Sequence, residues 1–413
     1  MNSTRQAGPA QGVLLVALGL LSTMAVVLLA PAIPPMQKHF AQFPQAGQWV
    51  TFSLTCPALC VALLSPFAGA IVDRLGRRRL LIASLIFYAI TGTAPLYLNS
   101  LPMIIASRLG VGLAETVLMT ASLTMLGDFF HGRARERYLA LNTAIASLSA
   151  TAFFAIGGLL ATHDWRLPYA VYATAILFLI AVVLLTWEPP RSAQTRVADI
   201  VTGNDGSFHW LPLLAICLVT VAGGVTFMLP QIQIGTITAA HGHSSPATAG
   251  MIGAIGSIAM PVGAFVFNLL RKRRISVPWL IILAFLLSGC GLLGLAHAPT
   301  LKLLAASMVL HEFGCGFMLP GVMAWTLGLL PYEQRGKGTG AYMTSFFIAQ
   351  PICGFLFGVV EQAAGGRPLA ATAVFGFGAI GCALLLFIIG SALGALGEKL
   401  QSNNGLPPVA GLH

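Results

Sequence analysis

Charged residues are scarce in this sequence of 413 residues. Only 8% of them are Asp, Glu, Lys or Arg, against roughly a quarter in a typical soluble domain. Acidic residues are the scarcest, with 12 in the whole chain, whereas hydrophobic residues make up 57% and the mean hydropathy is +0.85. A soluble fold has too little interior to hide so much apolar surface, so the sequence predicts a protein whose solvent is lipid.

Signs of enzymatic or metal chemistry are missing as well. The seven cysteines all fall in apolar segments, none forms a C-x-x-C pair, and no His/Cys cluster has zinc-binding spacing. Gly376, Gly378 and Gly381 fit the pattern G-x-G-x-x-G, but they lie inside an apolar run with no strand before it. We therefore expect neither a cofactor nor a metal ion, no ATP binding, and a protein that is not an enzyme.

Long apolar runs are abundant, and they recur about twelve times. Each is near the ~20 residues that a helix needs to cross the hydrocarbon core, and none shows the alternation of a membrane β-barrel. The sequence predicts spans at 13–35, 48–72, 80–98, 102–127, 137–161, 167–187, 210–238, 247–270, 277–297, 303–330, 338–361 and 369–396. The predicted fold class is an all-α membrane protein.

The net charge of +10 follows the predicted membrane topology. Of the 22 Lys and Arg residues, Lys38, Arg166, Lys302 and Arg367 fall on one side, Arg108 falls within a span, and the remaining 17 fall on the other side. Because positive charge is retained on the cytoplasmic side, both termini are predicted to be cytoplasmic. The basic balance therefore reflects topology and not nucleic-acid binding. The compact loops favour a bacterial inner membrane.

One loop carries a recognisable motif. Five charges fall within the seven residues Asp73–Arg79, between two apolar runs, and Gly69 and Gly76 flank them. The pattern G-x-x-x-D-R-x-G-R-R-R resembles the loop between helices 2 and 3 of the major facilitator superfamily. The whole chain resembles the twelve-span drug:proton antiporter group of that family.

The two halves of the chain are similar to each other. A shift of 204 residues aligns Arg108–Gly112 with Glu312–Gly316, and a shift of 194 aligns the loop motif with Gly263–Arg273. Facilitator transporters consist of two six-helix halves around a central site. We predict an N-terminal bundle at 1–187, a cytoplasmic linker at 188–209, a C-terminal bundle at 210–396 and a cytoplasmic tail at 397–413.

The resemblance implies that the loop motif acts as a conformational latch, which holds the halves together in one state near the start of the eleventh span. The latch residues would be Gly69, Asp73, Arg74, Gly76, Arg77, Arg78 and Asp128. Asp128 closes the fourth span and would pair with Arg77 or Arg74. Topology alone requires the arginines but neither Asp73 nor the glycines. A purely topogenic loop is the alternative.

Three charges lie deep within predicted spans. Arg108 and Glu115 are seven residues apart, which places them on one helix face, and the repeat makes Arg108 equivalent to Glu312. Charge at that depth is costly and normally faces a partner or a wet cavity. We predict that Arg108 and Glu312 face each other across a central cavity and that Glu115, Glu312 and Arg108 couple transport to protons. A fixed structural ion pair is the alternative.

The substrate site is weakly encoded. Aromatic, methionine and amide side chains suit adaptable binding of amphipathic molecules. The candidates are Met24, Gln37, Asn142, Phe227, Met228, Gln231, Gln233, Phe317, Trp325, Tyr342 and Gln350. The partners would be a small-molecule substrate, protons and membrane lipids, and we expect a monomer.

Three functions compete at this point. The resemblance favours proton-coupled export of small amphipathic molecules by alternating access. However, Phe153 and Phe154 stand where exporters of that group often carry Gly-Pro, and only Gly157 and Gly158 of that pattern remain. The alternatives are a proton-coupled uptake symporter for an organic acid or another nutrient, in which Arg108 would bind a carboxylate, and a non-transporting membrane sensor.

Overall fold

The computed structural model describes residues 7–188, 210–330 and 335–403, and the elements of these residues are helical. The first half contains α1 (Pro9–Ala17), α2 (Gly19–Val27), η1 (Ala30–Ala32), α3 (Ile33–His39), α4 (Ala46–Leu75), α5 (Arg77–Thr93), η2 (Ala94–Leu96), α6 (Leu101–Phe129), α7 (Gly132–His163), η3 (Leu167–Ala173) and α8 (Thr174–Leu185). The second contains α10 (Trp210–Ala240), α11 (Pro246–Ser257), α12 (Ala259–Lys272), α13 (Val277–His297), α14 (Leu301–Leu329), α15 (Arg335–Ala363) and α16 (Pro368–Asn403).

The predicted all-α membrane fold is confirmed. In the described ranges, 11 segments are long and apolar enough to cross a bilayer. Helix α7 adds a further long helix, of which Leu148–His163 is an apolar stretch. Large apolar side chains are exposed along the outer helices, as lipid-facing surfaces require. On α16, for example, Phe377 is 64% exposed.

The first span differs from the single run predicted at 13–35. It extends from Pro9 to His39 and is divided into α1, α2, η1 and α3. Pro31, Pro34 and Pro35 lack the backbone N–H that a continuous helix needs, which accounts for the irregular turn after α2. The eighth span is interrupted in a similar way between α11 and α12, just before Pro261. Broken helices of this kind expose backbone carbonyl groups inside the protein.

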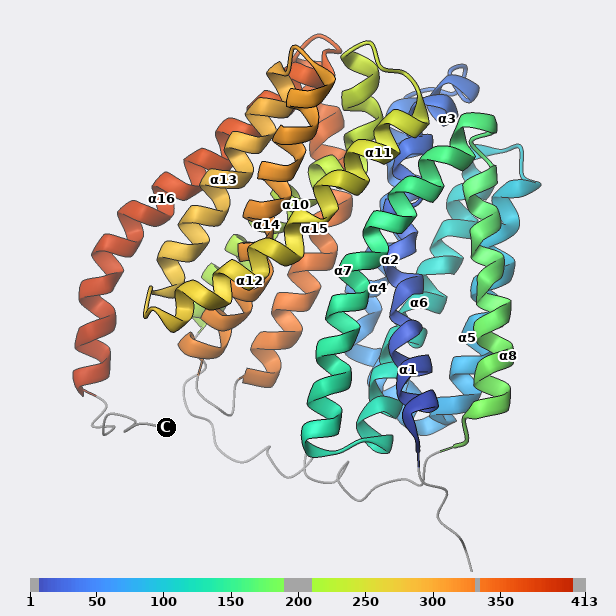
Figure 1. Cartoon of the computed structure of the whole chain (residues 1–413), viewed down its shortest axis with the longest axis horizontal. Helices are drawn as coiled ribbons and strands as arrows, with labels where there is room; N and C mark the ends of the chain where they lie inside the picture. Colours follow the sequence, from blue (N-terminus) through green and yellow to red (C-terminus); the bar gives the residue numbers. More distant parts are fainter. Residues whose placement is uncertain (1–6, 189–209, 331–334, 404–413) are drawn as a thin grey trace, which may run out of the picture.

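Figure 1 shows two groups of helices, α1–α8 and α10–α16, which approach each other at one end and separate toward the end where α1 begins and α16 ends. At the closed end, helix α7 packs on α11 and helix α4 packs on α15. Glycines bring these backbones together, since a Cβ atom on Gly158 would lie 2.9 Å from the Cα atom of Gly250. Thr151 and Ser257 share a hydrogen bond of 2.8 Å between the same two helices.

The two predicted connecting segments lie mostly outside the described residues. Of the linker predicted at 188–209, the structure describes Glu188 alone. Of the tail predicted at 397–413, residues 404–413 lie outside. Helix α16 continues to Asn403, which is beyond the predicted end of the last span at 396.

Candidate functional site

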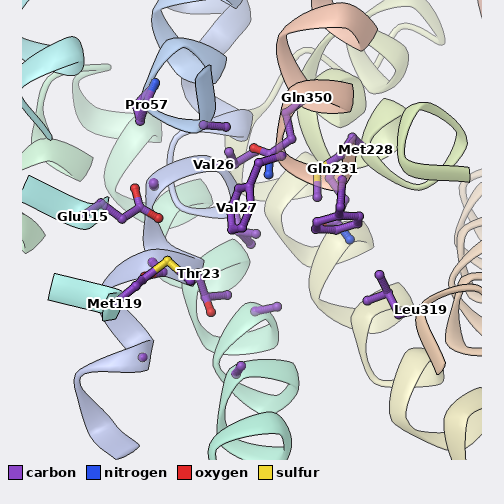
Figure 2. A pocket seen from close by; sticks show the side chains of 18 of the residues that line it. Thr23, Val26, Val27, Pro57, Glu115, Met119, Met228, Gln231, Leu319 and Gln350 are labelled. Carbon is purple, nitrogen blue, oxygen red and sulfur yellow. The ribbon is translucent and has the colours of Figure 1, made fainter. Parts of the chain in front are cut away.

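A cavity of about 360 Å³ lies between the two groups of helices. The first half lines it from α2, α4, α6 and α7, and the second half from α10, α11, α12, α14 and α15. Most of the lining is apolar, with methionine and phenylalanine side chains such as Met119, Met228, Phe227 and Phe346. In Figure 2, Glu115 and Met119 lie on one wall, and Gln231 and Gln350 lie on the other.

The polar lining has an uneven charge. Glu115 and Glu312 both line the cavity, and no Lys, Arg or His is among the described residues that line it. The remaining polar side chains are neutral and include Asn142, Gln231 and Gln350. The cavity can therefore accept positive charge or hydrogen-bond donors, whereas it offers an anion no positively charged partner.

Glu312 is fully buried on α14 and is bonded to Gln231 of α10. The Nε2 group of Gln231 donates to Oε1 of Glu312 at 2.9 Å. The remaining side-chain oxygens of the pair, Oε2 of Glu312 and Oε1 of Gln231, are buried without a hydrogen-bond partner among the described residues. An unmet buried acceptor is costly, so this pair would be stabilised by a proton on Glu312 or by a donor that arrives from the cavity.

Glu115 lies in the middle of α6, with 4% of its surface exposed. Its side chain lines the cavity together with Ser22 of α2 and Pro57 of α4. The hydroxyl group of Ser22 is buried beside the carboxyl group of Glu115. Glu115 and Glu312 thus place one ionisable group on each half of the molecule, at the same cavity.

Arg108 does not lie where the repeat predicted. It is fully buried on α6, it is absent from the cavity lining, and its Nη2 group donates to the backbone oxygen of Ala25 at 3.1 Å. Its guanidinium lies over the rings of Tyr172 and Tyr169, at 4.9 and 5.9 Å from their centres. The expectation that Arg108 faces Glu312 across the cavity was wrong, because the arginine points into the first half. Glu115 takes the cavity position two helical turns away.

The predicted substrate residues divide into three groups. Those that line the cavity are Asn142, Phe227, Met228, Gln231 and Gln350. Gln37 and Gln233 line a smaller pocket of about 110 Å³.

Met24, Phe317, Trp325 and Tyr342 do not line the cavity, and packing explains their positions. Met24 is buried in the core of the first half. Phe317 packs edge-on against Phe267 in the core of the second half. Trp325 is partly buried against that core. The hydroxyl of Tyr342 donates to the backbone oxygen of Leu319 at 3.5 Å.

Sequence reasoning missed several cavity residues. Ser22, Thr23, Met119, Ser257, Phe346 and Phe347 line the cavity and were not among the candidates. Their residue types are common in membrane helices, and a helix that is apolar all round gives no sign of which face meets the cavity. Only their spacing from Glu115 could have indicated Met119, which lies one turn further along α6.

A second polar cluster surrounds the predicted latch motif. Arg77 is 8% exposed and forms ion pairs with Asp73, at 3.0 Å, and with Asp128. Of the two arginines proposed as partners of Asp128, Arg77 makes this contact. The residues that lead into α15, 331–334, lie outside the described part of the chain, so the expected approach of the motif to the eleventh span is left as a prediction.

The glycines of the motif behave differently from each other. Gly76 has φ = +98° and ψ = +130°, a conformation reserved for glycine, between α4 and α5. A Cβ atom on Gly69 would meet no heavy atom within 4 Å. In this conformation Gly69 therefore faces open space and not a neighbouring helix.

Glu188 is a partner of the motif that sequence reasoning missed. Its carboxylate accepts hydrogen bonds from the backbone N–H groups of Arg77, at 2.6 Å, and of Arg78, at 3.1 Å. Arg78 also donates from Nη2 to the backbone oxygen of Val183 at 2.9 Å. The end of the sixth span is thereby joined to the first turn of α5, where a negative charge is favourable.

Comparison with known proteins identifies the family. The family model described as Major Facilitator Superfamily matches residues 15–236 and 213–405. The chain belongs to the major facilitator superfamily. Among solved structures, a bacterial homolog of the human lysosomal transporter Spinster, in an inward-facing and unoccupied conformation, is similar with a TM-score of 0.76 and 16% identity. The similarity covers 98% of this chain and 100% of that one.

The curated relatives include proteins named for multidrug resistance and proteins named as sugar-proton symporters. Multidrug resistance protein 1 of Bacillus subtilis is 25% identical over 48% of this chain and 51% of its own length. The arabinose-proton symporter of Escherichia coli is 27% identical over 42% of this chain and 36% of its own length. The chain thus spans about half or less of these two relatives. This chain is a multi-pass member of the major facilitator superfamily, in which the named relatives are transporters.

Proposed function

We propose that this facilitator protein exports small amphipathic molecules in exchange for protons, and that it prefers molecules with a positive charge. One observation carries the proposal: the cavity between the two halves is lined by Glu115 and Glu312 and by no basic side chain in the described residues. The surrounding phenylalanine and methionine side chains suit the apolar part of such a molecule.

The Glu312–Gln231 pair supports exchange as the mode of coupling. Its two unmet acceptor oxygens need a donor, and either a proton or a donor group of the substrate can supply it. If each satisfies the pair, the two compete for the site. Competition between a proton and a cation for the same carboxylates is what an antiporter requires.

Alternating access is supported by the way in which the halves touch. Helices α7 and α11, whose backbones touch at Gly158 and Gly250, come together at the end of the molecule away from the start of α1 and the end of α16. With both termini in the cytoplasm, as the distribution of Lys and Arg predicts, this contact closes the outer side. We propose that bundles 1–187 and 210–396 rock about the cavity, with the motif cluster near Arg77 forming the opposite closure.

The position of Arg108 gives little support to uptake of an organic acid. That alternative needs Arg108 to bind a carboxylate, but Arg108 is buried behind the cavity wall. Uptake of a neutral, hydroxyl-bearing nutrient is the second candidate. The amide side chains Asn142, Gln231 and Gln350 in the cavity are suited to hydroxyl groups, and one relative is named as a sugar symporter.

The test uses inverted membrane vesicles that contain the protein, with an imposed pH gradient that is acidic inside. Ethidium serves as the cationic amphipath, carboxyfluorescein as the anionic one and arabinose as the neutral sugar. We expect gradient-driven accumulation of ethidium alone. Accumulation of carboxyfluorescein would contradict cation export. Movement of arabinose out of the vesicles together with the protons would contradict it as well.

The carboxyl groups are tested by Glu115→Gln and Glu312→Gln. Each substitution removes one titrating site, so we expect ethidium flux to fall at least about tenfold, equivalent to roughly 1.4 kcal/mol, and its dependence on pH to flatten. Glu136→Gln is the matched control, because Glu136 is exposed at the start of α7, away from the cavity. Normal flux with normal pH dependence in both cavity variants would remove the proton-coupling role.

A further inference from the structure

We propose that Tyr169 and Tyr172 are positioning residues that hold the Arg108 guanidinium behind the cavity, so that its charge acts on Glu115. This inference rests on the role proposed above for Glu115. It concerns an aromatic box, defined here as the rings of Tyr88, Tyr169 and Tyr172 around Arg108.

The box is built by an irregular helix. The sixth span begins as the 3₁₀-helix η3, with Pro168 in its first turn. In a 3₁₀-helix, side chains three residues apart lie one above the other, so Tyr169 and Tyr172 share a face. Their rings stack at 6.4 Å with an interplanar angle of 24°. An α-helix has 3.6 residues per turn, so at this place it would point the two rings in different directions around the helix axis.

Neighbouring helices make room for the box. A Cβ atom on Gly92 of α5 would lie 2.3 Å from Cδ1 of Tyr172, so the ring occupies the space that this glycine leaves. Tyr88 of the same helix lies against Tyr172 at 5.3 Å and donates its hydroxyl to the backbone oxygen of Leu21 at 2.7 Å. Contacts with α5 and with the backbone of Leu21 thus hold the rings in place independently of Arg108.

Arg108 lacks the partner that a buried cation usually has. It is 0% exposed, and it forms no ion pair with a described residue. One hydrogen bond, to the backbone oxygen of Ala25, is present, whereas the Nε and Nη1 groups have no hydrogen-bond partner in the described residues. Because a buried charge without a partner is unfavourable, the electron-rich faces of the tyrosine rings are the main stabilising surroundings of this cation.

The ring faces matter here more than the hydroxyl group of Tyr172. That hydroxyl is buried and makes no hydrogen bond of regular geometry in the described residues, although it lies close enough to Arg108 to interact with it, while the ring centre lies 4.9 Å from the Cζ atom of Arg108. A phenyl ring offers a similar face without the hydroxyl. This distinction makes the role of Tyr172 testable by conservative substitution.

The held charge is directed at Glu115. The two residues lie two turns apart on one face of α6, and Ala25, which accepts the hydrogen bond from Arg108, lines the cavity beside Glu115. A positive charge favours the ionised form of a carboxyl group. The other titratable groups that face this pair are Cys56 and Cys60 of α4, Tyr88 of α5, and Tyr169 and Tyr172 of η3. Glu312 lies across the cavity.

The experiment compares Tyr172→Phe with Tyr172→Leu in the purified full-length protein. The readout is the infrared band of the protonated carboxyl group that Glu115→Gln removes, followed as a function of pH. Losing the ring frees Arg108 to move away, so Tyr172→Leu should move the midpoint of this titration upward by about one pH unit. Tyr172→Phe should leave it unchanged. Tyr97→Leu is the matched control, because Tyr97 is 81% exposed.

The outcomes separate this inference from the proposed function. An unchanged midpoint in Tyr172→Leu, or an equal shift in Tyr172→Phe, would overturn the positioning role. Transport without pH dependence would overturn the proton-coupled function while the infrared titration still reports on Arg108. If Tyr172→Leu does not fold, fluorinated phenylalanines at position 172 keep the shape and weaken the ring face, and the midpoint should rise with each added fluorine.

Discussion

The turn between α4 and α5 and the turn between α12 and α13 occupy equivalent places in the two halves, yet they are built differently. In the first, Arg77 is 8% exposed and pairs with Asp73 and Asp128. In the second, the equivalent Arg271 is exposed and donates from Nη1 to the backbone oxygen of Ile275 at 2.9 Å. The position of Asp73 is taken by Phe267, which packs in the core.

The comparison separates two uses of positive charge. The basic residues common to both turns are sufficient for the predicted topology. The acidic residues Asp73, Asp128 and Glu188 gather at the first turn, where they bind one arginine side chain and two backbone N–H groups. We therefore propose that conformational control is confined to the first turn, and three predictions test this asymmetry.

Arg77→Gln should have the largest effect. Removing one partner of a fully buried pair costs about 3–5 kcal/mol, and the 37% exposure of the Asp73 side chain lowers this to roughly half. We expect a clear fall in melting temperature and at least about a tenfold loss of ethidium flux, which corresponds to roughly 1.4 kcal/mol. Arg271→Gln is the matched control and should behave as the parent protein. Equal losses in both variants would show that the turns do not differ.

Gly76→Ala should have an intermediate effect. The φ of +98° at Gly76 is strained for any residue with a Cβ atom, at a cost of about 1–3 kcal/mol. The Cβ atom would also lie 3.3 Å from Oε1 of Glu188, which would have to shift and weaken its hydrogen bonds to Arg77 and Arg78. Thermal unfolding of the purified protein measures the loss. Gly69→Ala, where the added atom meets open space, should unfold as the parent protein does, and similar destabilisation of both would refute the distinction.

Glu188→Ala should have the smallest effect of the three. It removes the acceptor of two N–H groups in the first turn of α5, and loss of a helix cap costs about 0.5–2 kcal/mol. We expect a small fall in melting temperature and a severalfold slower flux, with Glu188→Gln retaining part of both. Since Glu136 is exposed and carries the same charge, Glu136→Ala controls for net charge. A flux unchanged by Glu188→Ala would exclude this residue from the motif's function.

The sequence was informative where one constraint dominated. Long apolar runs predicted the membrane helices, because few other structures satisfy the backbone in lipid. The rarity of acidic residues deep within apolar runs also led to Glu115 and Glu312, which do line the cavity. Arg108 was misplaced because the repeat equates backbone positions and says nothing about which way a long side chain turns. Glu188 was missed because its partners are backbone N–H groups distant in sequence, which leave no residue pattern.

The aromatic box was beyond prediction for a related reason. Tyr169 and Tyr172 meet Arg108 only because η3 is a 3₁₀-helix, and a hydropathy pattern does not distinguish this winding from an ordinary membrane helix. The broken first span has the same origin. Its prolines were visible, but the free carbonyl group at Ala25 was not, because the N–H of Leu29 donates to Val26 and the carbonyl group of Ala25 is left to accept from Arg108.

The bond from Arg108 to Ala25 has a practical consequence for genetic dissection of this transporter. The acceptor is a main-chain atom in the wall of the cavity, and every amino acid supplies the same atom there. Scanning mutagenesis would therefore pass over position 25 as tolerant even if a bound molecule signals to the guanidinium through it. An amide-to-ester replacement after residue 25, which weakens the carbonyl as an acceptor and keeps the side chain, is the kind of change that reaches this link.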